Sequence, residues 1–136
     1  MCGIAGIMTV DGTSPSDDVL NAFAISLQHR GPDGRGEFRH KNVALVQTRL
    51  SIIDLEAGEQ PIKDDKGNVI SANGEVYNYI ELSKTLEPEL IKTKSDCEPP
   101  LHLYGQKGIS FVDDLRGMFA ISIYDTNEGR LVLTRD

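Results

Sequence analysis

The sequence predicts an α+β fold in which helices cover antiparallel β-sheet. Segments with strand character dominate, and the helical segments are inserted among them as a block, whereas a doubly wound parallel sheet needs regular alternation of strand and helix. The chain of 136 residues matches a single domain, which at this size can bury a core without metal ions or crosslinks. With 39% apolar and 26% charged residues, the composition is typical of a globular protein rather than a disordered one.

Charge and hydropathy argue against several classes of function. The 14 Lys and Arg residues against 21 Asp and Glu residues give a formal net charge of −7, which disfavours binding to nucleic acid or to an anionic membrane. No apolar run reaches the roughly 18 residues of a membrane span, and the N-terminus lacks the regions of a secretory signal. We therefore expect a cytoplasmic protein with no nucleic-acid or membrane partner.

The N-terminal segment predicts a strand and a helix. Small and apolar residues over 2–10 indicate a strand buried on both faces. Ser14 and Pro15 then provide a helix start, and apolar residues at near-helical spacing predict a helix over 15–28. Three glycines and a proline make 29–36 a loop, because they fit neither periodic element.

The next segments predict strands joined by turns. Strands are expected over 37–40 and 43–49, and an apolar stretch over 50–55 leads into a loop over 56–61. The sequence Asp-Asp-Lys-Gly at 64–67 is typical of a hairpin turn. The hairpin strands are expected over 62–64 and 68–72.

The second half predicts helices followed by a final hairpin. A helix over 78–87 and a short strand over 90–93 precede Ser95, which with Glu98 forms a capping-box pattern. Pro100 complicates a helix there, so regular helix is expected to begin only at the prolines. The remaining expected elements are a short helix over 109–115 and strands over 117–125 and 130–135.

Cys2 is the first candidate for a reactive residue. Removal of Met1 is expected when the next side chain is as small as cysteine, and it leaves a thiol and an α-amine on one residue. An α-amine with its ordinary pKa of about 8 can accept the thiol proton near neutral pH, and the thiolate is a strong nucleophile. A cysteine at this position also occurs by chance, so position alone does not establish catalysis.

Further polar residues suit acyl transfer, each with a structural alternative. Asn73 and Gly74 at a predicted strand end can direct a side-chain amide and a backbone N–H at an oxyanion, although Asn-Gly is also the commonest tight-turn pair. Arg49 ends an apolar strand, where it can bind a carboxylate through two hydrogen bonds or form an edge-strand salt bridge. Glu75 and Asp96 can bind an ammonium group, and Asp96 can equally be a helix-start residue.

The remaining cysteine and the histidines are interpreted as structural. Cys97 is expected to be a small, half-buried residue beside a helix start. His29 is interpreted as a structural hydrogen-bonding residue, His40 as a surface strand residue, and His102 as a solvated or capping side chain. Histidines this far apart, without close Cys or carboxylate partners, predict no metal site.

Five sequence blocks occur in an order that resembles a known family. The chain is similar to the N-terminal glutaminase domain of glutamine-hydrolysing asparagine synthetases, within the class II glutamine amidotransferases, and the similarity runs from residue 1 to 136. The blocks at 29–33 and 73–79 distinguish it from the glucosamine-phosphate and phosphoribosylamine relatives. The five blocks are Met-Cys-Gly-Ile-Ala-Gly at 1–6, His-Arg-Gly-Pro-Asp at 29–33, Arg-Leu-Ser-Ile-Ile-Asp-Leu at 49–55, Asn-Gly-Glu-Val-Tyr-Asn-Tyr at 73–79 and Ser-Asp-Cys-Glu at 95–98.

The resemblance implies a fold and a catalytic mechanism. The fold is that of the N-terminal nucleophile hydrolases, with two stacked antiparallel β-sheets between helix layers. Matched by position, Cys2 is the nucleophile and its own α-amine is the base. Asn73 and the backbone N–H of Gly74 form the oxyanion hole.

The resemblance also implies L-glutamine as the substrate. Arg49 matches the residue that binds the glutamine α-carboxylate, and Glu75 and Asp96 match residues around its α-amine. The backbone near Leu50 and Ile52 is expected to line the same pocket.

Three departures from the family pattern affect what we expect. Gln47 stands where the family usually has a histidine, which threatens local hydrogen bonding, and Pro100 is unexpected beside Asp96. The family continues past residue 136 into further strands and an ATP-dependent synthetase domain, whose Ser-Gly-Gly-x-Asp-Ser loop is absent from this sequence. We therefore expect 1–136 to be an amidotransferase domain that is incomplete at its C-terminus. It is expected to need no cofactor, since ATP and magnesium belong to the synthetase domain.

The expected partners are L-glutamine, the synthetase domain and, as an open alternative, a second copy of the chain. A different class of function also remains open. The chain can be a non-catalytic module or an inert fragment, because missing final strands expose a sheet edge that invites pairing. A third interpretation keeps the glutaminase but gives its ammonia to an acceptor other than aspartate.

Overall fold

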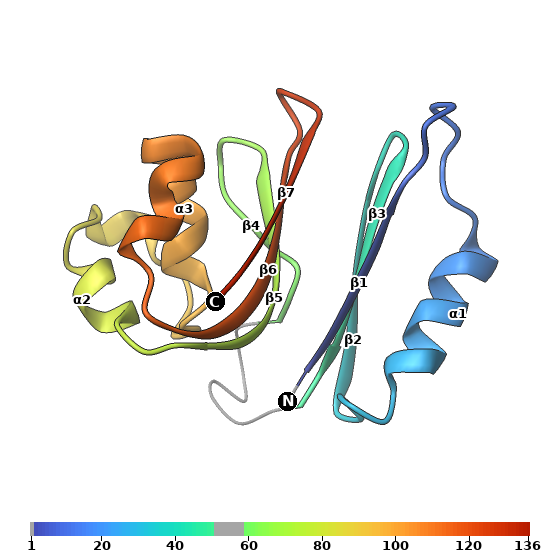
Figure 1. Ribbon diagram of the computed structural model, residues 1–136, viewed down its shortest axis with the longest axis horizontal. Helices are drawn as coiled ribbons and strands as arrows, with labels where there is room; N and C mark the ends of the chain where they lie inside the picture. Colours follow the sequence, from blue (N-terminus) through green and yellow to red (C-terminus); the bar gives the residue numbers. More distant parts are fainter. Residues whose placement is uncertain (1, 51–58) are drawn as a thin grey trace.

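The fold was analysed in a computed structural model that describes residues 2–50 and 59–136. Four layers follow one another in space, two antiparallel sheets in the middle and helices on both outer sides (Figure 1). This arrangement confirms the α+β class with two stacked sheets between helix layers. The first sheet has the order β1 (Gly3–Met8), β3 (Val43–Arg49), β2 (Gly34–His40), and the second has the order β4 (Ile62–Lys63), β5 (Asn68–Val76), β6 (Gly117–Asp125), β7 (Arg130–Arg135).

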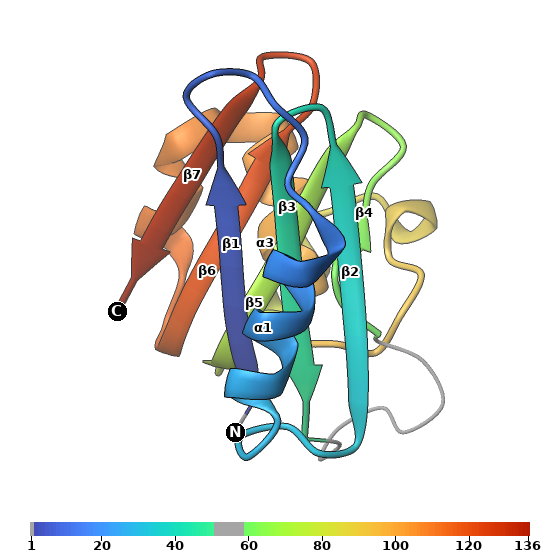
Figure 2. The same cartoon turned by 90° about the vertical axis from the view of Figure 1, so that its right-hand side faces the viewer.

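Helix α1 (Asp17–Leu27) covers the outer face of the first sheet (Figure 2). Its apolar face, with Leu20 and Ala24, packs on Ala44 and Val46 of the central strand β3. Of the three described strands in this sheet, only β3 is buried along nearly its whole length, because it has a neighbour on each side and a layer on each face. The expectation that the first strand is buried on both faces is wrong, since β1 lies at a sheet edge and Met8 is 43% exposed.

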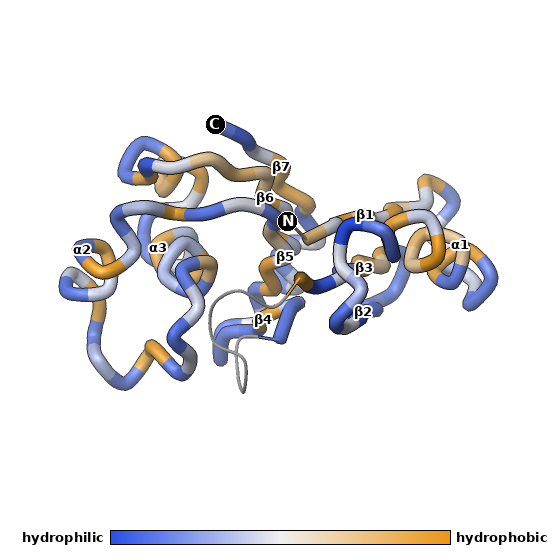
Figure 3. Tube along the Cα trace, turned by 90° about the horizontal axis from the view of Figure 1, so that it is seen from below, coloured by the Kyte–Doolittle hydropathy of each residue, from blue (hydrophilic) through white to orange (hydrophobic). Residues whose placement is uncertain are grey.

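Two apolar clusters hold the second sheet in place. One lies between the sheets and joins Phe38 and Leu45 to Val69 and Tyr124. The larger one lies between the second sheet and the helices α2 (Tyr79–Ser83) and α3 (Glu98–Lys107). Seen from below, α1 and α3 lie on opposite outer sides of the paired sheets (Figure 3). The adjacent residues Val69 and Ile70 of β5 belong to different clusters, because successive side chains of a strand point to opposite faces.

The loop expected over 29–36 ends earlier than predicted. Strand β2 already begins at Gly34, where it pairs with Arg49 of β3. Gly36 faces the backbone of Gln60, and a Cβ at this position would overlap the carbonyl oxygen of Gln60. Gly34 and Gly36 therefore lie in a strand and not in a loop. Gly36 lets this strand pass close to the segment that leads into the second sheet.

We expect Gly36→Ala to lower the free energy of unfolding by about 2–3 kcal/mol, because the backbone at Gln60 must move to admit the new methyl group. Gly34→Ala is the matched control, since a Cβ there would lie 3.5 Å from the Cβ of Arg49, an ordinary contact. Urea unfolding of both variants measures the difference. Equal stability of the two variants would contradict the close approach.

Several helical predictions need correction. The helix expected over 78–87 is shorter, and a 3-10 turn at Pro88–Leu90 replaces the strand expected over 90–93. The capping box is also wrong: Cys97 is the N-cap, and the Glu98 carboxylate accepts hydrogen bonds from Lys92 and Thr93 instead of reaching back to Ser95. Confirmed within a few residues are α1, the 3-10 helix at Gly108–Asp114, and the strands β3, β6 and β7.

Strand β5 runs further than expected, to Val76 instead of 72. It carries Asn73 and Gly74 inside the sheet, paired with Ala120 and Phe119 of β6. The tight-turn interpretation of Asn-Gly is therefore wrong. No helix within the described ranges 2–50 and 59–136 is long and apolar enough to cross a membrane.

Candidate active site

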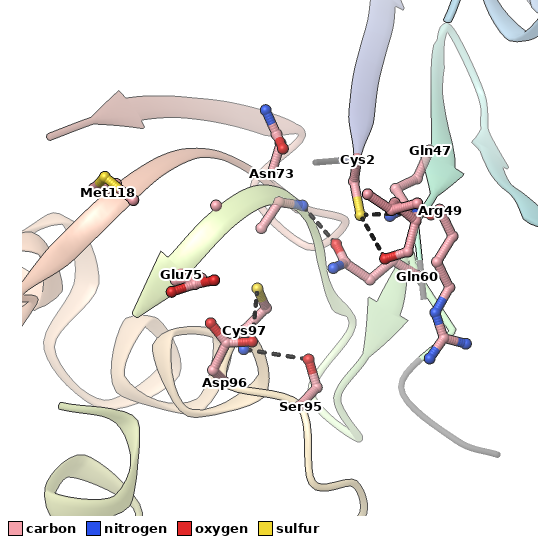
Figure 4. Close-up of a pocket in the computed structure, with 13 residues that line it drawn as sticks. Cys2, Gln47, Arg49, Gln60, Asn73, Glu75, Ser95, Asp96, Cys97 and Met118 are labelled. Atoms are coloured by element: carbon pink, nitrogen blue, oxygen red, sulfur yellow. Dashed lines mark hydrogen bonds between the residues drawn. The ribbon is translucent and has the colours of Figure 1, made fainter. Parts of the chain in front are cut away.

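A cavity of about 90 Å³ opens where the two sheets and α3 converge (Figure 4). Its lining comes from the residue before β1, the end of β3, the segment before β4, the second half of β5, the start of β6 and the segment that leads into α3. Seven of the eight residues predicted for the site line this cavity, and Ile52 lies outside the described residues. The seven are Cys2, Arg49, Leu50, Asn73, Gly74, Glu75 and Asp96.

Cys2 is half-buried and its sulfur faces the chain just beyond β3. The sulfur accepts a hydrogen bond from the backbone N–H of Leu50 at 3.4 Å, and the thiol lies 3.8 Å from the Leu50 carbonyl oxygen. The carbonyl of Cys2 accepts a hydrogen bond from Nε of Arg30 at 3.2 Å. These contacts hold the thiol at one place in the cavity, which a flexible N-terminal tail could not do.

Beyond its short pairing with β4, β5 turns one edge toward the cavity. The N–H of Ala72 donates to Oε1 of Gln60 at 2.6 Å, and the N–H of Val76 donates to Oδ2 of Asp96 at 2.8 Å. Because N–H directions alternate along a strand, the N–H of Gly74 between them belongs to the same edge.

Gly74 has a φ of +141°, a value that favours glycine, and a Cβ here would overlap the Met118 carbonyl oxygen of β6. The preceding residue, Asn73, has a side-chain oxygen that is buried without a hydrogen-bond partner among the described residues. This oxygen is an acceptor and can bind a further donor, whereas the Nδ2 group of the same amide is the part that can donate to an oxyanion. The strand therefore offers both a backbone N–H and a side-chain amide at the cavity.

Asp96 and Cys97 form the opposite wall. Asp96 is only 8% exposed, and its Oδ1 lies 3.7 Å from the thiol of Cys97, which is 4% exposed rather than half-buried as expected. Burial, and secondarily the negative charge of Asp96, raise the pKa of the Cys97 thiol far above its ordinary range. Cys97 therefore remains a protonated thiol at neutral pH, and Cys2 is the better candidate for a nucleophile.

The charged residues of the cavity have both signs. Arg49 contributes a guanidinium, and Glu75 and Asp96 contribute carboxylates. Arg49 ends the central strand of its sheet, so the edge-strand interpretation of this residue is wrong. A cavity that combines one cation with two anions is complementary to a zwitterion, such as the α-amino acid end of a small substrate.

Some lining residues were missed by the sequence analysis. Gln60 was assigned to a loop, yet its side chain reaches β5, and no local pattern announces this contact. Ser95 lies beside Asp96 in the sequence and could have been included on that basis. Gln47, the departure from the family pattern, is 1% exposed and also lines the cavity.

A second departure from the family pattern, Pro100, does not displace Asp96. Helix α3 begins at Glu98, so Pro100 lies in the first turn, where the N–H groups have no partner within the helix. Asp96 keeps its hydrogen bond to β5. His102, in contrast, is buried at 6% exposure and is not the solvated side chain that was expected.

Comparison with known proteins places this geometry in a family. The family model of the glutamine amidotransferase domain matches residues 1–136. Asparagine synthetase [glutamine-hydrolyzing] 2 of Bacillus subtilis is 42% identical over all of this chain and 19% of its own length. Asparagine synthetase [glutamine-hydrolyzing] 1 of Arabidopsis thaliana is 38% identical over all of this chain and 24% of its own length. The chain thus spans about a fifth to a quarter of these curated relatives.

A solved structure is similar in fold. The glutamine phosphoribosylpyrophosphate amidotransferase of B. subtilis, complexed with ADP and GMP, matches with a TM-score of 0.74 at 21% identity. The match covers 98% of this chain and 37% of that chain, and it confirms the predicted N-terminal nucleophile hydrolase fold. The chain therefore belongs to the glutamine amidotransferase domain family and is homologous to the glutaminase part of the asparagine synthetases.

Proposed function

We propose that this chain hydrolyses the side-chain amide of L-glutamine to glutamate and ammonia, with Cys2 as the nucleophile. The observation that carries the proposal is the single cavity in which a half-buried thiol, an amide with a backbone N–H, one guanidinium and two carboxylates come together. Each of these groups corresponds to one need of the reaction. The family membership supports the same activity.

The chemistry begins with removal of Met1, which frees the α-amine of Cys2. This amine takes the thiol proton, and the sulfur attacks the carbon of the substrate amide. The resulting oxyanion accepts hydrogen bonds from the Asn73 amide and the Gly74 N–H. Collapse expels ammonia, which leaves with the proton held by the amine, and forms a γ-glutamyl thioester. Water then cleaves the thioester to release glutamate and restore the thiol.

The other end of the substrate is bound by charge. In this proposal Arg49 binds the α-carboxylate through two hydrogen bonds, and Glu75 and Asp96 bind the α-ammonium group. The backbone at Leu50, which lines the cavity, borders the aliphatic part of the substrate. Asp96 already has one oxygen committed to β5, so it would contact the ammonium group from a rigid position.

The proposal extends to the destination of the ammonia. In a protein of the length of the relatives, the ammonia would serve ATP-dependent amidation of aspartate at a synthetase domain. ATP and magnesium would belong to that domain and not to this chain. A different acceptor is compatible with the same glutaminase chemistry, and product analysis of the whole protein separates the two.

The test of the proposed function is hydrolysis of L-glutamine by the Met1-free chain. Glutamate and ammonia should appear in equal amounts, and L-asparagine, which is one methylene shorter, should give far less product. A non-catalytic module would give no product above buffer, and this result would contradict the proposal.

A further inference from the structure

The segment that carries Ser95 and Asp96 to the cavity has no regular secondary structure. It lies between the 3-10 turn at Pro88–Leu90 and the start of α3. The Asp96 carboxylate accepts hydrogen bonds from the N–H of Val76 at 2.8 Å and from the Cys97 thiol at 3.7 Å. The rest of the segment is held by the carboxylate of Glu98, the first residue of α3, which is only 1% exposed.

The Glu98 carboxylate accepts three hydrogen bonds from the beginning of this segment. Its Oε1 accepts from the N–H of Lys92 at 2.9 Å, and its Oε2 accepts from the N–H and the hydroxyl of Thr93, each at 2.7 Å. An ionised carboxylate only accepts, so all three donors suit it. His102 places Nε2 3.5 Å from Oε1 on the helix side. These hydrogen bonds hold the buried Glu98 carboxylate in one position.

Further hydrogen bonds connect Thr93, which contacts the Glu98 carboxylate, with the residues that line the cavity. The Thr93 hydroxyl oxygen accepts from the N–H of Ser95 at 3.1 Å. The Ser95 hydroxyl oxygen accepts from the N–H of Cys97 at 3.3 Å (Figure 4). The Cys97 thiol in turn faces the Asp96 carboxylate. A continuous path of contacts thus connects Glu98 with a carboxylate of the cavity.

We propose that Glu98, acting through Thr93, is a positioning residue that orients Asp96 for the α-ammonium group of the substrate. The inference rests on the proposed function, because it needs glutamine in the cavity. Glu98 itself lines no part of the cavity. Its loss should therefore weaken recognition of the ammonium group and leave the reacting atoms at Cys2 in place, which predicts a change in KM rather than in kcat.

Two substitutions, Thr93→Val and Glu98→Gln, test the path of contacts. Thr93→Val removes one hydroxyl donor at nearly constant volume, and Thr93→Ser keeps the hydroxyl and serves as its matched control. Glu98→Gln replaces one acceptor oxygen with an NH₂ group that must face an N–H donor. Glu89→Gln, at an exposed glutamate of the preceding 3-10 turn, controls for loss of a negative charge.

The readout compares glutamine with glutaramate, which is glutamine without its α-amine. For Thr93→Val and Glu98→Gln, KM for glutamine should rise by about tenfold or more at similar kcat, as expected for loss of a hydrogen bond to a charged group. Hydrolysis of glutaramate should change by less than about twofold, and Thr93→Ser and Glu89→Gln should behave as the wild type with both substrates.

The outcomes separate this role from the proposed function. An equal loss with both substrates, or unchanged KM for glutamine in both test variants, would overturn the positioning role. A wild-type chain that hydrolyses no glutamine would overturn the proposed function itself, and the positioning role with it. If Glu98→Gln does not fold, Thr93→Val still tests the positioning role, because this variant removes only one hydroxyl group.

Discussion

We expect Cys2→Ala to lower kcat for glutamine hydrolysis by about 10⁴-fold or more, because no other group in the described part of the cavity can replace the thiolate. Cys97, the second thiol of the cavity, cannot do so, since burial and the Asp96 charge raise its pKa and keep it protonated. Cys2→Ser should also be severely impaired, since a hydroxyl gives up its proton far less readily than a thiol. Ammonia release under saturating glutamine measures both variants.

The control for this prediction is the fold of the variant. Cys2 precedes β1 and contributes no side chain to the two apolar clusters around the second sheet or to the packing of α1 on β3, so thermal unfolding of Cys2→Ala should match that of the wild type. An alanine variant that unfolds normally and keeps activity within tenfold of the wild type would show that Cys2 is not the nucleophile.

Asn73→Ala is expected to lower kcat by about 10²–10³-fold with a small change in KM, since the amide donates to an oxyanion that exists only after attack. Asn73→Asp should be at least as impaired, because it replaces the donor with a negative charge of the same shape beside the developing oxyanion. Steady-state kinetics with L-glutamine give kcat and KM separately.

Asn21→Ala provides the matched control for Asn73. Asn21 lies exposed on α1, where its side chain accepts a hydrogen bond from Arg35 far from the cavity, so its loss should leave both kinetic constants unchanged. The opposite pattern for Asn73→Ala, a raised KM with unchanged kcat, would assign Asn73 to ground-state binding and remove it from the oxyanion hole.

Local sequence predicts best those elements whose hydropathy pattern matches their burial in the fold. Strands β3, β6 and β7 were predicted with their observed bounds, because long apolar runs lie between clear turns. Asn73-Gly74 was misjudged as a strand end because the pair suits turns, whereas pairing with β6 continues through it. The start of β2 was missed for a similar reason, since the close approach of Gly36 to Gln60 is a tertiary contact.

Some residues of the candidate site could likewise be predicted from local sequence, and others could not. Seven of the eight site residues named from the ordered blocks come together in one cavity, and the chemistry of each side chain can be read from the sequence. Gln60 could not be found, because only the fold brings its amide to β5. The protonation of Cys97 and the network at Glu98 depend on burial, which periodicity predicts poorly in a helix start that contains two prolines.

The most direct test of Cys2 as a glutamine-directed nucleophile is the intact mass of the full chain before and after exposure to 6-diazo-5-oxo-L-norleucine, an electrophilic glutamine analogue. We predict loss of the Met1 mass and a single stoichiometric adduct, mapped by peptide sequencing to Cys2, with Cys97 unmodified and excess L-glutamine slowing the reaction. A chain that loses Met1 but stays unmodified, or an adduct on Cys97, would contradict the role of Cys2 as the nucleophile.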